Sequence, residues 1–400
     1  MNGSDAYTPA AELDRRTAEL QEHLRKEGMD GALILQKSDL FYFSGTIQQA
    51  HLYIPAEGEP LLMAFKDFHR ARRESALARV VPLTSPKKLP DLLRENGLAV
   101  PSVMGMELDV LPVNLHAFYQ KIFEGTGIRD VSHPIRLVRS VKSDYEIGII
   151  RKAAAFSDKV CEYAREVLRE GMTELEAAGM IEGYARKLGH QGTVRMRLWG
   201  NELFYGHLMC GPTAAVPSYL ASPTGGEGPN PAIAQGAGFS EIRRGEPILL
   251  DYVFAWNGYI SDLTRLFALG DLPDELLKAQ EAAIDIHETI RRAALPGAPA
   301  GEVYAAAVER ADALGYADNF MGVGESRIRF VGHGVGLELD EYPFLAKGQG
   351  LPLREGMVVA IEPKLIFPGK GVVGVENTCL LTADGLVPLG KYPEAITVIR

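Results

Sequence analysis

The stretch from Pro247 to Phe267 constrains the fold of this 400-residue chain more than any other. It reads PILLDYVFAWNGYISDLTRLF, two apolar runs separated by Asn257-Gly258. That dipeptide is a strong signal for a two-residue hairpin turn, because both central positions of such a turn need positive φ. The sequence therefore predicts two antiparallel strands in a defined register, with Trp256 facing Tyr259.

Each predicted strand carries one acid in apolar surroundings, Asp251 and Asp262. Counting outward from the turn places Val253 opposite Asp262, and Asp251 shares the face of Val253 because side chains alternate along a strand. The two carboxylates are then diagonal neighbours with Cα atoms roughly 7–8 Å apart, within reach of a shared ion. A carboxylate is almost never buried without a partner. The one basic residue of the hairpin, Arg265, faces the other way if the strand is regular, so a metal ion is the favoured partner.

Three further candidate ligands follow in the last quarter of the chain. His333 lies in RIRFVGHGVGLELDEYP, where flanking glycines let the backbone approach a site closely. Two later apolar strands, MVVAIEPKLI and GVVGVENTCLL, carry Glu362 and Glu376 on either side of a turn within FPGKG. The glutamates are fourteen residues apart, so a loop with an odd number of residues would set them opposite each other on one face. The metal hypothesis requires this register.

Two aspartates, two glutamates and one histidine predict a dinuclear metal centre. Four carboxylates balance two divalent cations, which removes the free-energy cost of burying each acid alone. Oxygen-rich ligands with a single imidazole suit Mn²⁺, Zn²⁺, Co²⁺ or Fe²⁺. Bridging carboxylates hold two ions about 3.5–4 Å apart and can generate a hydroxide at neutral pH. The alternative is a set of unrelated strand acids, each satisfied by backbone groups or arginines.

The composition excludes several other classes of function. A net charge of −10 and a pI of about 5.5 argue against nonspecific nucleic-acid binding and against a basic membrane-binding surface. No apolar run is long enough to span a bilayer. The three cysteines, Cys161, Cys210 and Cys379, are far apart and are interpreted as reduced thiols, so we expect a cytoplasmic protein.

Strands that alternate with helices through the first part of the chain predict an α/β domain over residues 1–135 and a second domain over residues 136–400. Within the first, FYFSG is interpreted as a strand, and the segment SHPIRLVRS at the boundary is interpreted as extended. In the second, Thr173 and Glu176 form a predicted capping box that begins a helix. A long loop follows, PSYLASPTGGEGPNPAIAQGAG, and loops of this length are more often functional than idle.

Four of these segments, DYVFAWNGYISDLTR, GHGVGLELDEYP, IEPKL and VEN, resemble the metal-site motifs of the creatinase, aminopeptidase P and prolidase family. RLVRSVKSDYEIGIIRKAA resembles the start of the catalytic domain of these "pita-bread" metallopeptidases, and the first domain fits their N-terminal domain. The resemblance covers nearly the whole chain. It implies an α/β N-terminal domain plus an α+β pita-bread C-terminal catalytic domain, a homodimer, and peptide substrates with proline after the scissile bond.

The resemblance also implies a role for each candidate ligand. Asp262 and Glu376 would bridge two ions, and Asp251 would chelate one of them. His333 and Glu362 would complete the other, with Glu362 also acting as the proton shuttle. Mn²⁺ is the expected metal, with Zn²⁺, Co²⁺ and Fe²⁺ as alternatives.

Three substrate-facing positions depart from the family pattern. Asp340 stands where such peptidases have a second histidine, and Gly374 stands where they often have an arginine. Ser218, in GPTAAVPS, lies near the place of a substrate-contacting histidine. An imidazole can donate to a carbonyl oxygen, whereas a carboxylate at neutral pH only accepts. His207, in FYGHLMCG, is either a replacement catalytic donor or an ordinary strand histidine.

Three classes of function are compatible with these residues. The leading class is a metal-dependent Xaa-Pro aminopeptidase or dipeptidase, with Asp340 and Ser218 facing a small peptide. The departures favour a second class on the same scaffold, a creatinase-like or ectoine-hydrolase-like hydrolase or a sulfonium lyase acting on a small molecule. A metal-free binding module is the third class, and the presence of all five ligands speaks against it.

Overall fold

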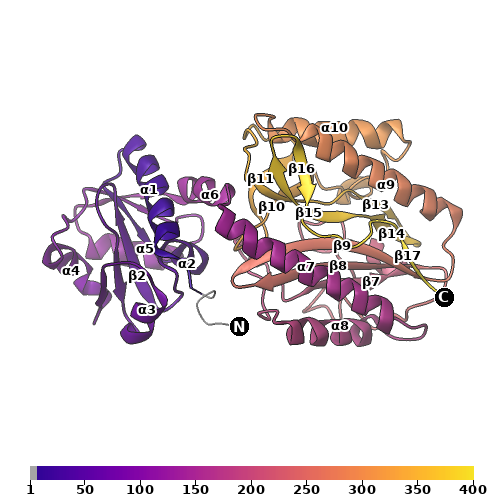
Figure 1. The fold of residues 1–400 in the computed structure, drawn as a ribbon, viewed down its shortest axis with the longest axis horizontal. Coiled ribbons are helices and arrows are strands. Elements are labelled where there is room, and N and C mark those ends of the chain that lie inside the picture. The colour runs from indigo at the N-terminus through magenta and orange to yellow at the C-terminus, as the bar shows by residue number, and fades with distance from the viewer. Residues whose placement is uncertain (1–6) are drawn as a thin grey trace. The chain divides into compact units, whose positions relative to one another are not determined.

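The computed structural model describes residues 7–400, and by its internal contacts the chain divides into two compact units after Arg139 (Figure 1). We predicted the division after residue 135, and the first six residues of that predicted domain lie outside the described part. No helix among the described residues is long and apolar enough to cross a membrane.

The N-terminal unit is built on one mixed sheet. Among the described residues this sheet has six strands in the order β4-β3-β2-β1-β5-β6. The strands are β1 Gly31–Ile34, β2 Ala50–Pro55, β3 Leu61–Ala64, β4 Val80–Pro82, β5 Val103–Met106 and β6 Gly127–Asp130. The helices of this part are α1 Ala10–Lys26, α2 Lys37–Ser44, α3 Phe68–Glu74, η2 Pro86–Lys88, α4 Leu89–Glu95, α5 Val113–Ile122 and α6 Ser132–Ser140. The predicted α/β class of this domain is confirmed.

Two local predictions in this region are wrong. FYFSG belongs to α2, whose first turn is capped by the Gln36 side chain and whose end is Gly45 in the left-handed region. Caps at both ends favour a helix over the strand that the aromatic run suggested. SHPIRLVRS forms α6, because Pro134 lies in the first turn, where its missing N–H removes no helical hydrogen bond.

The C-terminal unit is organised around a larger sheet with the order β11-β10-β12-β15-β9-β8-β7, where β16 pairs with β15 and β17 with β9. Strands β13 and β14 form a separate hairpin. The strands are β7 Gly206–Cys210, β8 Pro247–Trp256, β9 Tyr259–Leu269, β10 Phe330–Gly334, β11 Glu341–Ala346, β12 Val358–Ile361, β13 Lys364–Phe367, β14 Gly371–Gly374, β15 Glu376–Thr382, β16 Gly385–Pro388 and β17 Thr397–Ile399. The helices are α7 Asp144–Val167, α8 Glu174–Leu188, η3 Gly211–Ala215, α9 Asp274–Ala293, α10 Ala300–Ala313 and η4 Gly324–Ser326.

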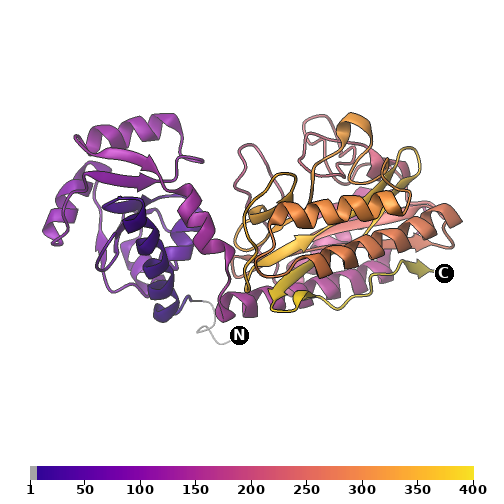
Figure 2. The same ribbon diagram turned by 90° about the horizontal axis from the view of Figure 1, so that it is seen from above.

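Helices cover both faces of the sheet of this unit. Alternate β8 residues, Ile248, Leu250 and Tyr252, pack in one core cluster with α7 and α8. Helices α9 and α10, which run side by side in Figure 2, belong to a second cluster with β12 and β15. The predicted capping box of Thr173 and Glu176 begins α8. Since strand side chains alternate, Asp251 faces away from α7 and α8.

Candidate metal centre

The hairpin β8–β9 has the register that the sequence predicts. Trp256 pairs with Tyr259 and Val253 pairs with Asp262. The turn residues Asn257 and Gly258 both have positive φ, 47° and 87°. The register prediction is therefore confirmed, and it places both hairpin acids on one cavity wall.

The two glutamates also satisfy their required register. Strands β12 and β15 pair Ile361 with Asn377, and the β13–β14 hairpin pairs Lys364 with Gly374. Both pairings continue one register, so Glu362 and Glu376 face each other between them. The loop between the paired ends of β13 and β14 is residues 368–370, an odd number as required.

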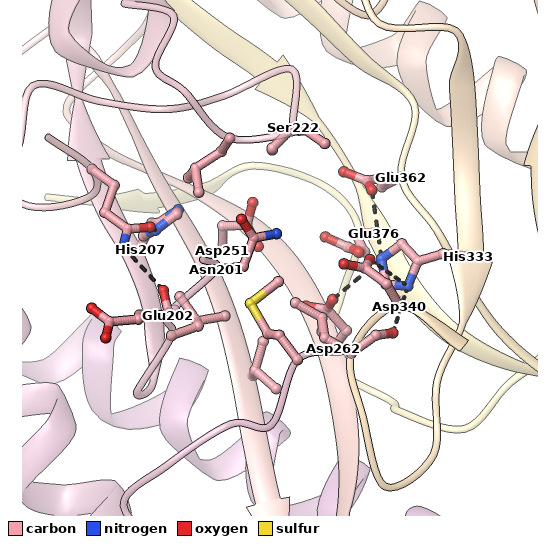
Figure 3. Close-up of a pocket in the computed structure, with 18 of the residues that line it drawn as sticks. Asn201, Glu202, His207, Ser222, Asp251, Asp262, His333, Asp340, Glu362 and Glu376 are labelled. Atoms are coloured by element: carbon pink, nitrogen blue, oxygen red, sulfur yellow. Dashed lines mark hydrogen bonds and ion pairs between the residues drawn. The ribbon is translucent and has the colours of Figure 1, made fainter. Parts of the chain in front are cut away.

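One cavity gathers most of the predicted site residues (Figure 3). His207 and Asp340 line it as well as the predicted ligands Asp251, Asp262, His333, Glu362 and Glu376. Ser218 is not among the lining residues that the structure describes, and its hydroxyl donates to the Ala234 carbonyl instead. Ser222, from the same loop, lines the cavity, and nothing in the sequence of this aperiodic loop distinguished the two serines.

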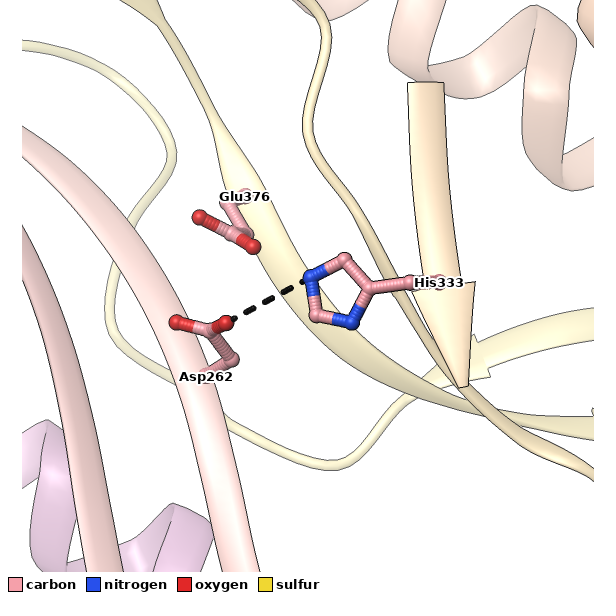
Figure 4. Close-up of side chains that lie close together, drawn as sticks. All are labelled: Asp262, His333 and Glu376. Atoms are coloured by element: carbon pink, nitrogen blue, oxygen red, sulfur yellow. Dashed lines mark ion pairs between the residues drawn. The ribbon is translucent and has the colours of Figure 1, made fainter. Parts of the chain in front are cut away.

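His333 is oriented for metal binding by its own backbone surroundings. Its Nδ1 lies 2.9 Å from the Leu339 carbonyl oxygen, which can only accept, so Nδ1 carries the proton. The lone pair of Nε2 is then free, 3.7 Å from Asp262 Oδ2 (Figure 4) and 3.7 Å from Glu362 Oε1 (Figure 3). Burial alone would lower the pKa of His333, but the surrounding carboxylates, Asp340 foremost, raise it above its usual value.

Asp262, His333 and Glu376 form the tightest group of potential ligands (Figure 4). One ligand atom from each lies within 4.8 Å of the others. Asp262 Oδ1 is buried without a hydrogen-bond partner in residues 7–400, and burial together with the nearby Glu376 carboxylate raises the pKa of Asp262 well above its usual value. A divalent cation would satisfy this oxygen and remove the repulsion, so these residues fit one ion.

Lys364 is the member of the site that sequence reasoning missed. Its Nζ donates to Asp251 Oδ2 at 2.8 Å and to Glu362 Oε2 at 2.8 Å, and it lies 3.4 Å from Glu376 Oε2. Burial alone would lower the pKa of Lys364, but the carboxylates, Asp251 first, raise it well above its usual value. The sequence could have placed Lys364 in the site, because it follows Glu362 by two residues. In an extended chain, side chains two residues apart point to the same face.

His207 on β7 extends the polar wall of the cavity. It pairs with Asp251 across β7 and β8, and its Nε2 lies 3.3 Å from Gln235 Oε1. Burial lowers the pKa of His207, against the opposing effect of Asp251. Gly236 packs on the ring, because a Cβ there would lie 2.8 Å from His207 Cδ2. The long Pro/Gly-rich loop therefore closes over this histidine.

Arg265 faces away from the cavity and supports it from behind. Its side chain is 2% exposed, and Nη1 donates to the Glu376 carbonyl oxygen at 2.8 Å. Nη2 donates to Asn377 Oδ1 at 2.8 Å. The expectation that Arg265 does not partner the hairpin acids is confirmed, and its bonds fix the backbone from which Glu376 projects.

Comparison with known proteins identifies the family. The model described as "Metallopeptidase family M24" matches residues 148–383, and "Creatinase/Prolidase N-terminal domain" matches residues 16–141. The chain belongs to metallopeptidase family M24. Its relatives include the Xaa-Pro dipeptidase of Pyrococcus furiosus, 28% identical over 95% of this chain and 98% of the relative. The putative dipeptidase YkvY of Bacillus subtilis is 25% identical over 96% and 99%.

Solved structures share the fold of this M24 chain along nearly its whole length. The Xaa-Pro dipeptidase from Bacillus anthracis superposes with a TM-score of 0.83 at 22% identity, covering 96% of this chain and 99% of that one. The prolidase from Pyrococcus horikoshii OT3 gives 0.78 at 25% identity, covering 95% and 99%. The predicted resemblance and the predicted pita-bread architecture are confirmed.

Membership of M24 implies the use of a divalent metal. Some of the predicted ligands in this site are available to bind one, and others already have a partner. Asp262, His333 and Glu376 offer an ordered lone pair and an unsatisfied carboxylate oxygen. The remaining predicted ligands, Asp251 and Glu362, are already hydrogen-bonded to an ammonium group. Asp262, His333 and Glu376 therefore fit one ion, and a second ion at Asp251 and Glu362 would have to displace this ammonium group.

Proposed function

We propose that this protein is a metal-dependent hydrolase that cleaves Xaa-Pro peptides, as a dipeptidase or an aminopeptidase. The observation that carries the proposal is the buried group of Asp262, His333 and Glu376 at the wall of one cavity. Family membership and the names of the full-length relatives support the peptide substrate. The comparisons do not favour the non-peptide alternatives.

The chemistry divides between the ion and the side chains around it. When bound by Asp262, His333 and Glu376, a divalent ion supplies Lewis acidity and makes water acidic enough to attack at neutral pH. Glu362 is 5% exposed and its Oε1 lies 3.7 Å from His333 Nε2. It is placed to accept the proton of the attacking water and to deliver it to the leaving nitrogen.

Two other cavity residues are proposed to contact substrate. His207 presents an imidazole that burial holds toward its neutral form, which suits a donor to the scissile carbonyl. Asp340 is partly buried on the same cavity wall. As a carboxylate it only accepts, so it suits a cationic group such as the free amino terminus of a short peptide.

The metal, the assembly and the cellular location are proposed from the family resemblance and from the composition. We propose Mn²⁺ because of the family resemblance, and Zn²⁺, Co²⁺ and Fe²⁺ suit the same donors. The homodimer rests on the same resemblance. The cytoplasmic location rests on the three cysteines, all of which are buried and free. The net charge of −10 supports a small-molecule or peptide partner over nucleic acid.

The substrate class can be tested with a panel of compounds on Mn²⁺-loaded protein. We expect Xaa-Pro dipeptides to be cleaved with kcat/KM at least roughly 10–200-fold above matched Xaa-Ala dipeptides, the range that a single methylene contributes in a hydrophobic pocket. We expect no turnover of small amidines or sulfonium compounds in the same assay. Activity on either of those classes, with none on Xaa-Pro dipeptides, would move the protein to the non-peptide class.

A further inference from the structure

The unusual feature of this centre is a lysine buried among acids that were expected to hold metal. Lys364 is 1% exposed, and three carboxylates lie within 3.4 Å of its Nζ. Two of them, Asp251 and Glu362, lie at 2.8 Å. An ammonium and a divalent ion cannot occupy the same space between these oxygens, so the lysine competes directly with one metal position.

Lys364 is held in place at its backbone, and the stem of its side chain packs closely on Gly374. Its backbone is fixed by pairing with Gly374 in the β13–β14 hairpin and by a 2.9 Å bond from the Met321 N–H to its carbonyl. Gly374 makes room for the side chain, because a Cβ at that position would lie 2.8 Å from Lys364 Cγ. The glycine that departs from the family pattern and the lysine opposite it thus form one packing unit.

Charge counting favours a single ion beside this lysine. The cluster holds four carboxylates, from Asp251, Asp262, Glu362 and Glu376. Two divalent ions and an ammonium would place five positive charges against these four, with the ammonium in contact with the ions' own ligands. One ion and the ammonium place three positive charges against four, and the repulsion between cations is confined to one pair.

We propose that Lys364 takes the place of one of two cations, so that this centre binds a single divalent ion through Asp262, His333 and Glu376. Asp251 then serves as the partner of the lysine and not as a metal ligand. The inference deepens the proposed function and rests on it, because it assumes that a divalent ion binds. It replaces the dinuclear centre that the sequence predicted with a mononuclear one.

The test is metal stoichiometry, measured without substrate. Metal-free protein is titrated with Mn²⁺ by calorimetry, and bound metal is counted by elemental analysis after desalting. We expect one equivalent per chain for the wild type and two for Lys364→Met, which keeps an unbranched side chain, shorter only by the ammonium nitrogen, and removes the charge. Lys370→Met is the matched control, because Lys370 is an exposed lysine at the turn of the same hairpin and should leave one equivalent.

Two further measurements test the inference without the Lys364→Met variant, in case that variant does not fold. The electron paramagnetic resonance spectrum of Mn²⁺ in the wild type should be that of an isolated ion, and Asp251→Asn should still bind one equivalent. If Lys364→Met does not fold, these two results decide.

Three results would overturn the inference. A magnetically coupled pair of ions in the wild type would overturn it and leave the proposed function intact. A folded Lys364→Met that still binds one ion would also overturn it. Protein that binds no Mn²⁺ would overturn it together with the metal-dependent function.

Discussion

Glu362→Gln is expected to lower kcat for Xaa-Pro dipeptides by about 10²–10⁴-fold, the usual contribution of a positioned acid or base. A neutral amide cannot carry the proton from the attacking water to the leaving nitrogen. It keeps an oxygen toward Lys364, which lies 2.8 Å from Glu362 Oε2, so the fold around the site should be retained. The measurement is steady-state kinetics alongside elemental analysis, with bound metal close to the wild-type level.

Two comparisons make this result specific to the proton-transfer role. Glu355→Gln, at an exposed position three residues before β12, changes the same chemical group and should leave kcat unchanged. Glu362→Ala should retain less metal than Glu362→Gln, because it also removes the oxygen. Near-normal kcat in Glu362→Gln would eliminate Glu362 as the proton carrier.

Glu376→Ala should lower Mn²⁺ affinity by more than about 100-fold. Removing a residue that only orients a metal ligand already costs about 10–100-fold, so removing a ligand should cost more. Glu376 is 1% exposed and projects from a backbone held by Arg265, so its carboxylate is fixed in the ligand group. The measurement is calorimetric titration of metal-free protein, with circular dichroism to verify the fold.

Thr264→Val provides the graded control for this substitution. The Thr264 hydroxyl donates to Glu376 Oε2 at 2.7 Å, so it orients the carboxylate without belonging to the ligand group. Removing this hydroxyl should lower Mn²⁺ affinity by about 10–100-fold. A Glu376→Ala protein that binds Mn²⁺ as tightly as the wild type would show that Glu376 is not a ligand.

The sequence predicted those parts of the site that depend on strand register. Asn257-Gly258 fixes the turn, and the turn fixes the pairing of Val253 with Asp262 without any knowledge of the tertiary structure. The pairing of the second hairpin was required by the metal hypothesis and not predicted, because the even separation of Glu362 and Glu376 leaves the parity of the turn open, and the structure satisfies the requirement. Where one face of a hairpin must stay buried and the turn residues are clear, the alternation of side chains is sufficient to predict the register.

Other features depend on packing that periodicity does not record. The aromatic residues of FYFSG suit a strand by composition, whereas the capping of α2 by Gln36 and Gly45 makes them helical. The choice between Ser218 and Ser222 depends on the path of an aperiodic loop. Lys364 could have been placed on the face of Glu362, but its contact with Asp251 requires the three-dimensional meeting of two hairpins.

The most direct test of metal-dependent hydrolysis at this cavity is Xaa-Pro dipeptide cleavage by protein stripped with a chelator and then titrated with Mn²⁺. We predict that turnover disappears when elemental analysis shows the metal to be gone, and that it returns in proportion to the Mn²⁺ bound. Glu376→Ala at the same free Mn²⁺ concentration should stay inactive. Full turnover by stripped protein, or equal reactivation of Glu376→Ala, would contradict a catalytic metal held by Asp262, His333 and Glu376.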